Sequence, residues 1–173
     1  MELSDGVVLL RFLEPADVPA IAAACVDPEI ARFTTEIPQP YTEADASGYV
    51  AFAADEWRTG TTRPLAIPDD RTATFLGAID VRLGDEGSIG YWVAPGARCR
   101  GVATRALRLL SRWAVTHGGV ERLVLTTHPE NVASQRVAEK AGFVREGVLR
   151  SHMAYRECRR DSVLFSLLPS DLV

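Results

Sequence analysis

The feature that most constrains the fold is an apolar run that passes through a short basic loop into a long amphipathic segment. The run covers residues 89–93, the loop residues 98–103 and the amphipathic segment residues 104–115. This order predicts a strand, a turn and a helix. The first N–H groups of such a helix have no partner inside it, and the helix dipole favours an anion there. The stretch therefore predicts a phosphate site at a helix start.

The residues of this loop suit close approach of a phosphate group. Gly101 and Ala103 are small, so backbone N–H groups stay accessible, and Arg98 and Arg100 can donate forked hydrogen bonds. The stretch is not a P-loop, because no Lys-Ser or Lys-Thr pair follows the glycine. It also lacks the three-glycine dinucleotide fingerprint. The plain alternative is an ordinary strand-to-helix turn with exposed arginines.

A second motif lies at residues 126–143. Asn131 is a good N-cap for a short helix over 132–141, and Gly142 stands where a left-handed residue ends a helix. Phe143 then begins a strand over 143–150. The apolar positions expected to face the core of this helix are Ala133, Val137 and Ala141.

Taken together, the two motifs resemble the GNAT superfamily of N-acetyltransferases. Arg98-Cys99-Arg100-Gly101-Val102-Ala103 resembles the acetyl-coenzyme A (acetyl-CoA) loop of that family. Asn131, Ser134 and the later Gly142-Phe143 resemble its second signature, in the form found among ribosomal-protein N-terminal (alanine/serine) acetyltransferases. The resemblance runs from Val7 to Leu168 and implies an acetyl-CoA-dependent acyltransferase.

The remaining segments predict an α+β protein. Strands are expected at 7–13, 64–67, 74–83, 88–93, 122–127, 143–150 and 161–168. Helices are expected at 14–24, 42–58, 101–117 and 132–141, with a turn or short helix at 27–33. The resemblance implies one GNAT domain over 1–173. Its central sheet is mixed but mostly antiparallel, is flanked by helices, and has a splay between the two middle strands.

Composition narrows the class of protein. The chain has 173 residues and a net charge of −4, which argues against a dedicated nucleic-acid binder. No apolar run is long enough to span a membrane, and the first residues do not resemble a signal peptide. The cysteines Cys25, Cys99 and Cys158 show neither disulfide nor metal-ligand spacing. We therefore expect a cytoplasmic protein, monomeric or homodimeric, without a metal site.

The resemblance also implies roles for individual residues. The backbone N–H of Val93 would polarise the thioester carbonyl, and the hydroxyl of Ser134 would lie near the thioester sulfur as a catalytic donor. A structural role for Ser134, through local hydrogen bonding, is the alternative. The residues expected to bind acetyl-CoA are Trp92, Val93, Arg98, Cys99, Arg100, Gly101, Val102, Ala103, Thr104, Asn131 and Ser134.

The general base is the least defined part of the expected site. Some relatives carry a carboxylate before the Ile-Gly-Tyr run or in the strand after Gly-Phe, but here those places hold Ser88 and the stretch 151–155. His152 is the candidate catalytic base, and Glu157 and Asp161 are weaker options. His128 is interpreted as a loop residue.

The expected reaction is acetyl transfer to a primary amine by direct attack in a ternary complex. A protein N-terminus is the most concrete acceptor, and a small amine such as an amino acid, polyamine or antibiotic is the alternative. A non-catalytic acetyl-CoA sensor and a ribosome- or RNA-associated protein that uses the arginines of residues 98–112 are further hypotheses. Four arginines near the end of the chain could favour an acidic acceptor: Arg150, Arg156, Arg159 and Arg160.

Overall fold

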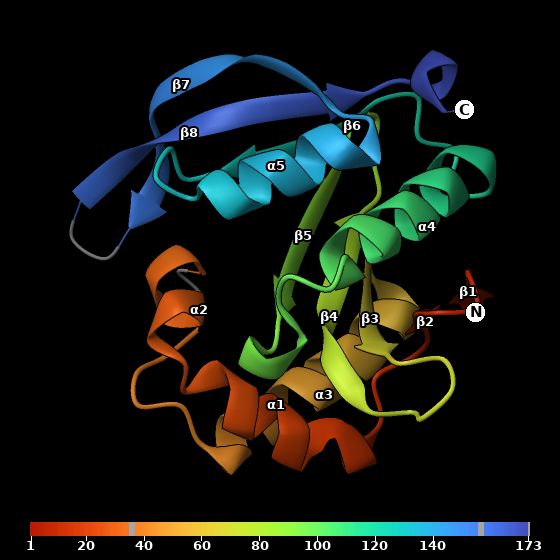
Figure 1. Cartoon of the computed structure of the whole chain (residues 1–173), viewed down its shortest axis with the longest axis vertical. Coiled ribbons are helices and arrows are strands. Elements are labelled where there is room, and N and C mark those ends of the chain that lie inside the picture. Colours follow the sequence, from red (N-terminus) through yellow and green to blue (C-terminus); the bar gives the residue numbers. More distant parts are fainter. Residues whose placement is uncertain (35–36, 156–157, 173) are drawn as a thin grey trace.

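A six-stranded sheet in the order β3-β4-β5-β6-β8-β7 forms the centre of the molecule (Figure 1). Its pairs are antiparallel except for β5 and β6, which run parallel. The mixed sheet flanked by helices confirms the predicted fold class. The computed structural model describes residues 1–34, 37–155 and 158–172. The strands are β3 (Thr62–Pro68), β4 (Phe75–Arg82), β5 (Gly87–Val93), β6 (Leu123–Thr127), β7 (Val144–Tyr155) and β8 (Cys158–Leu167).

Helices cover both faces of the sheet. The larger core cluster lies between the sheet and two helices, α4 (Val102–Thr116) and α5 (Val132–Ala141). A smaller cluster on the other face packs α1 (Val18–Cys25) and α3 (Glu43–Thr59) against the sheet. The short helix α2 (Pro28–Phe33) stands apart from both clusters, below the free ends of β7 and β8 in Figure 1. No described helix is both long and apolar enough to cross a lipid bilayer.

The helix ends follow the local signals in the sequence. Thr42 and Asp45 form a reciprocal capping box at the start of α3. Asn131 caps α5 by accepting the N–H of Ser134 at 3.0 Å, and Gly142 ends that helix with φ +99°. These ends are predictable because each depends on a side chain or a glycine within four residues.

The predicted strand over 7–13 is wrong in extent. The structure has a ribbon of two short strands, β1 (Leu3–Ser4) and β2 (Leu9–Leu10), and isolated bridges continue from it to β3 and the loop that follows. Gly6 turns the chain between them with φ +81°, and the Asp5 carboxylate accepts the N–H groups of Val7 and Val8. Backbone groups held by this turn are not available to a longer sheet ladder.

Two expectations near the end of the chain also need correction. Residues 151–155 were expected outside the strands, but β7 continues to Tyr155, with a register shift between Leu149 and Met153. In α5, Ala133 is exposed, while Ala138 and Ala141 are buried. A spacing of four exceeds the helical period of about 3.6 residues, so successive positions drift around the helix and Ala133 rotates out of the core.

Candidate active site

The parallel ladder between β5 and β6 is only two residue pairs long. Gly87 pairs with Leu123 and Ser88 pairs with Val124, after which the strands separate. Figure 1 shows β5 running away from β6 toward the loop that leads to α4. The expected splay between the middle strands is therefore present, and it leaves the inner edge of β5 unpaired over its last residues.

The hydrogen-bond alternation in β5 shows which main-chain groups face this gap. Ala94 donates its N–H to the carbonyl of Leu76 at 2.8 Å. In an antiparallel pair, bonded and non-bonded positions alternate, so Trp92 bonds toward β4 and Val93 points the other way. A Cβ on Gly77 would lie 2.3 Å from the Trp92 carbonyl oxygen, which confirms that Trp92 faces β4.

Of Trp92 and Val93, both expected to bind acetyl-CoA, only Val93 therefore directs its main-chain groups into the gap. The side chain of Trp92 lies on the opposite face of the sheet from α4, where its ring packs 5.7 Å from that of Phe75. Tyr91, which alternates with Trp92, shares the main-chain direction of Val93. The gap wall thus carries the N–H groups of Tyr91 and Val93.

The predicted phosphate loop leads directly into α4. Gly101 is the N-cap of this helix and has φ +78°, and a Cβ there would meet nothing within 4 Å. Cys99 is exposed and also left-handed, with φ +60°. Arg100 is exposed, Val102 is buried, and Ala103 and Thr104 are partly buried. The first-turn N–H groups of α4 therefore open onto uncrowded space beside a glycine, as an anion requires.

Basic side chains extend from this loop along α4. A groove of about 570 Å³ lies over them, and Arg105 pairs with Asp5 at 2.7 Å across it. Arg108 donates to the carbonyl of Lys140, at the end of α5. The groove is lined by Asp5, Gly101, Thr104, Arg105, Arg108, Leu109, Arg112 and Lys140.

Arg98 turns away from this groove toward α2. Its guanidinium donates to Asp27 at 2.6 Å, and the same carboxylate caps α2 by accepting the N–H groups of Glu29 and Ile30. The hydrogen bond from Arg98 is the largest of the effects that lower the pKa of Asp27. The Arg98–Asp27 pair thus connects the loop before α4 to the N-cap of α2, which lies 71 residues earlier in the sequence.

Ser134 lies in the first turn of α5, and its hydroxyl contacts Tyr91. The two hydroxyl oxygens are 2.9 Å apart. Burial raises the pKa of the Tyr91 phenol to about 12, so the phenol keeps its proton at neutral pH. The local motif placed Ser134 and Asn131 together, but the sequence interpretation missed Tyr91 as a partner of Ser134. The alternation of Ile89, Tyr91 and Val93 on one face of β5 was the available signal.

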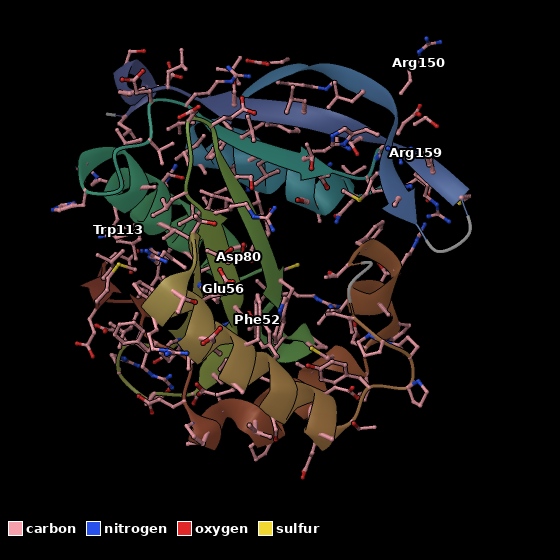
Figure 2. All side chains as sticks on the ribbon, turned by 180° about the vertical axis from the view of Figure 1, so that it is seen from behind. Phe52, Glu56, Asp80, Trp113, Arg150 and Arg159 are labelled. Carbon is pink, nitrogen blue, oxygen red and sulfur yellow. The ribbon has the colours of Figure 1, made fainter. Side chains whose placement is uncertain are left out.

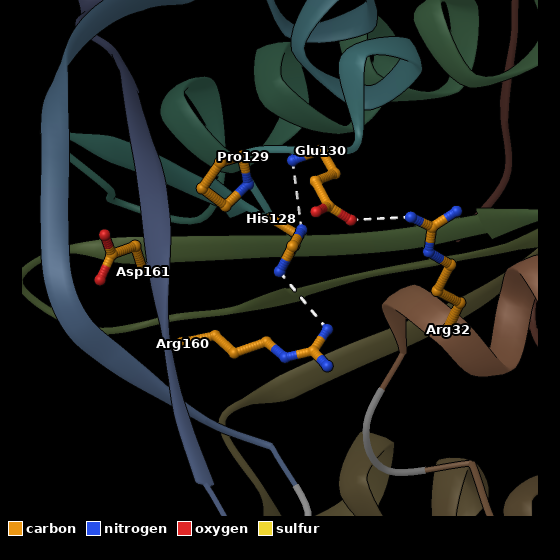
Figure 3. A pocket seen from close by; sticks show the side chains of 6 residues that line it. All are labelled: Arg32, His128, Pro129, Glu130, Arg160 and Asp161. Atoms are coloured by element: carbon orange, nitrogen blue, oxygen red, sulfur yellow. Dashed lines mark hydrogen bonds and ion pairs between the residues drawn. The ribbon is translucent and has the colours of Figure 1, made fainter.

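A second cleft of about 560 Å³ opens between α2, β8 and the turn after β6 (Figure 3). His128 lines it, although the sequence interpretation made this residue part of an ordinary loop. Its Nδ1 accepts the N–H of Glu130 at 3.2 Å, and its Nε2 lies 3.5 Å from Arg160. Arg32 pairs with Glu130 at 2.7 Å across the cleft. The cleft is lined by Arg32, His128, Pro129, Glu130, Arg160 and Asp161.

The candidate bases lie on β7 and β8. His152 is exposed, with Nδ1 3.2 Å from the Ser162 hydroxyl. Asp161 accepts the N–H of Ser151 at 2.8 Å and so holds the irregular part of β7. Glu157 falls outside the described residues. The described residues contain no group of three side chains suited to a metal ion.

The terminal arginines do not form one patch. Arg159 folds back on β7 and donates to the carbonyls of Ser151 and His152, both at 2.6 Å. Figure 2 shows Arg150 extending outward from the same region. Arg160 alone among the described three lines the cleft, and Arg156 falls outside the described residues.

Comparison with known proteins decides the family. The model of the acetyltransferase (GNAT) domain matches residues 8–144. The chain belongs to the GNAT acetyltransferases. It is 25% identical to "Putative ribosomal N-acetyltransferase YdaF" of Bacillus subtilis (strain 168), over 93% of this chain and 91% of YdaF. The protein is accordingly an acetyl-CoA-dependent N-acetyltransferase.

Solved structures share the fold across nearly the whole chain. RimJ of Mycobacterium smegmatis, solved with CoA-disulfide, has a TM-score of 0.85 and 24% identity, covering 99% of this chain and 88% of RimJ. The microcin C7 self-immunity acetyltransferase MccE, solved with acetyl-CoA and AMP, has a TM-score of 0.86 and 16% identity, covering 95% and 93%. The gap beside β5 and the open loop at Gly101 fit acetyl-CoA, the cofactor of this GNAT enzyme.

Proposed function

We propose that this acetyltransferase acetylates the N-terminal α-amino group of a protein by direct attack in a ternary complex. The observation that carries the proposal is the similarity to YdaF over nine-tenths of both chains. The cleft between α2, β8 and the turn after β6 supports it as the place where the acceptor enters. A protein end needs such an entrance, because the chain behind the amine must continue into solvent.

The lining of this cleft suits a polar peptide end better than an apolar amine. Arg32 and Arg160 supply positive charge, and Glu130 and Asp161 supply negative charge. A peptide N-terminus presents an amine together with backbone donors and acceptors, so it can pair with groups of both signs. Three of its lining residues, His128, Pro129 and Glu130, belong to the turn that precedes α5 and are therefore close in sequence to Ser134.

The chemistry of the amine fits the absence of a carboxylate from the two places, Ser88 and residues 151–155, where some relatives carry one. A protein α-amino group has a pKa of about 8, so about one tenth of these groups are already neutral at pH 7. A lysine amine has a pKa of about 10.4, so fewer than about one in a thousand lysine side chains are neutral at pH 7. Water or an imidazole such as His152 suffices for the α-amine.

Three parts of the chain would then assist the reaction: the loop before α4, the Val93 N–H and the Ser134 hydroxyl. Acetyl-CoA supplies a thioester whose thiol is the leaving group. The loop before α4 anchors the phosphates through its N–H groups, and the N–H of Val93 polarises the acetyl carbonyl. The hydroxyl of Ser134 donates a hydrogen bond to the departing sulfur. Holding the two reactants together supplies the rest of the acceleration.

The test is thiol release from acetyl-CoA with a panel of acceptors. The panel pairs each peptide that has a free N-terminus with the same peptide whose N-terminus is blocked and which carries an internal lysine. Polyamines, amino acids and aminoglycosides complete it. We expect turnover on free N-termini and none on the blocked partners. Faster turnover on a small amine than on any peptide would overturn the proposal in favour of a small-molecule acetyltransferase.

A further inference from the structure

The Tyr91 side chain connects the strand beside the gap to the helix α5. It starts on β5, and its hydroxyl reaches Ser134 on α5, 43 residues later in the chain. The phenol oxygen lies 2.9 Å from Ser134 Oγ and 3.4 Å from the carbonyl oxygen of the same residue. The Tyr91 phenol can therefore donate its proton to either of two oxygens of Ser134, the hydroxyl oxygen or the carbonyl oxygen.

We infer that Tyr91 is a positioning residue that turns the hydroxyl proton of Ser134 toward the sulfur of bound coenzyme A. The inference rests on the proposed placement of Ser134 beside the thioester. The main-chain groups of Tyr91 face the gap, so its backbone lines the space in which the sulfur would lie. Its side chain controls the Ser134 hydroxyl.

The two hydroxyls can share their protons in two ways. In one, Ser134 donates to the phenol oxygen, and the phenol donates to the Ser134 carbonyl. In the other, the phenol donates to Ser134 Oγ, and the serine proton is free to point into the gap. Negative charge that develops on the sulfur favours the second arrangement, because only there does Ser134 donate to it.

A phenylalanine in place of Tyr91 would remove this control. The phenol is hydrogen-bonded to the Ser134 hydroxyl, and without it the orientation of the serine proton is no longer set from β5. Because burial raises the pKa of the Tyr91 phenol to about 12, the phenol keeps the proton that it can donate at neutral pH.

The step leaves the protons of both side chains in place. The lone pair of the amine nitrogen forms the bond to the acetyl carbon, and the carbon–sulfur bond breaks with its electron pair going to sulfur. Ser134 donates a hydrogen bond to that sulfur and keeps its proton. The proton lost from nitrogen passes to the base, which is water or His152, and the thiolate takes a proton from water.

The test measures the pKa of the thiol of enzyme-bound coenzyme A, from its ultraviolet thiolate absorbance, without any acceptor present. If Ser134 donates to the sulfur, the thiol of bound coenzyme A has a lower pKa than the thiol of free coenzyme A titrated in the same buffer. We expect Tyr91→Phe and Ser134→Ala each to raise it. The double variant should raise it no further than Ser134→Ala alone, because Tyr91 acts through Ser134.

Two further measurements separate positioning from mere structural support. Affinity for desulfo-coenzyme A, which lacks the thiol, should stay within about twofold in all three variants, and kcat of Tyr91→Phe should fall about three- to tenfold with KM for acetyl-CoA unchanged. Tyr49→Phe is the matched control, because Tyr49 packs in the cluster on the other face of the sheet. It should leave the bound thiol pKa unchanged.

Two results would overturn the inference. One is a bound thiol pKa in Tyr91→Phe equal to that of the unaltered enzyme. The other is an equal loss of affinity for coenzyme A and desulfo-coenzyme A, which would make Tyr91 a structural brace between β5 and α5. Since the titration contains no amine, either result leaves the proposal of a protein N-terminal acceptor to its own test.

Discussion

Asp27 and Arg98 form an ion pair with 2.6 Å between carboxylate oxygen and guanidinium nitrogen. The pair connects the loop before α4 to the first turn of α2, and Arg32 at the other end of α2 lines the proposed acceptor cleft. Arg98 is also one of the residues expected to bind the phosphates. The Arg98 guanidinium can thus pair with either of two anions, the Asp27 carboxylate or a phosphate of the cofactor.

The first prediction separates these two roles. Asp27→Asn keeps an oxygen that can cap α2 but removes the charge that holds Arg98. We expect the free energy of unfolding to fall by less than about 1 kcal/mol, because the pair is partly exposed. Affinity for coenzyme A should rise about two- to fivefold as Arg98 becomes free for phosphate. Calorimetry of coenzyme A binding measures this, and Arg98→Ala in the same background should abolish the gain. Weaker binding by Asp27→Asn would contradict the prediction.

The second prediction concerns Gly101. Gly101→Glu should abolish coenzyme A binding, because it puts bulk and negative charge at the position proposed for the phosphates. Its control is Gly101→Ala, which carries the same left-handed strain of about 1–2 kcal/mol but adds only a methyl group in open space. We expect the alanine variant to melt earlier and still bind coenzyme A within about fivefold. Equal affinity in both variants would remove the phosphates from this loop.

The third prediction is a pH dependence of stability. Hydrogen bonds from Arg122 and Ser166 lower the pKa of Glu146 from its ordinary 4.5 to about 2. Because the folded pKa lies below the unfolded one, ionised Glu146 stabilises the fold above pH 4.5, and this contribution is lost as the pH falls toward 2. Urea unfolding should show Glu146→Gln less stable than the unaltered protein at pH 6. The difference should shrink at pH 3, and a constant difference would contradict the assignment.

The fourth prediction tests His152 as the general base. If its imidazole takes the proton of the α-amine, His152→Gln should lower kcat/KM for a peptide about tenfold at pH 6.5. The loss should fade by pH 8.5, where most of the amine is already neutral. A pH–rate profile of both proteins measures this. A loss of the same size at every pH would assign His152 to support of the β7–β8 pair through Ser162.

The sequence predicted those parts of the fold that depend on near neighbours. The caps at Thr42 and Asn131, the left-handed Gly142 and the strand–loop–helix around Gly101 all follow from side chains or glycines a few positions apart. The separation of β5 and β6 and the presence of an acetyltransferase fold followed from the family resemblance.

What the sequence did not predict depends on contacts between distant segments. The Tyr91–Ser134 and Asp27–Arg98 contacts join positions 43 and 71 residues apart. The alternation in β5 indicates the face on which Tyr91 lies, but it does not identify Ser134 as the partner. Residues 151–155 are mostly polar or small, so their place in β7 comes from pairing with β8 and not from their own pattern. The cleft around His128 takes one wall from α2, which no local signal around His128 predicts.

The early end of the β5–β6 ladder leaves two sheet edges inside the molecule, where an ordinary sheet has them only at its rims. An interior edge can bind an extended molecule such as the pantetheine arm of acetyl-CoA through main-chain N–H and C=O groups, which do not depend on side-chain identity. Most side chains around such an edge are therefore free to diverge, while the shape of the opening is kept. This tolerance is consistent with a chain that keeps a TM-score of 0.86 to a relative with which it shares 16% of its residues.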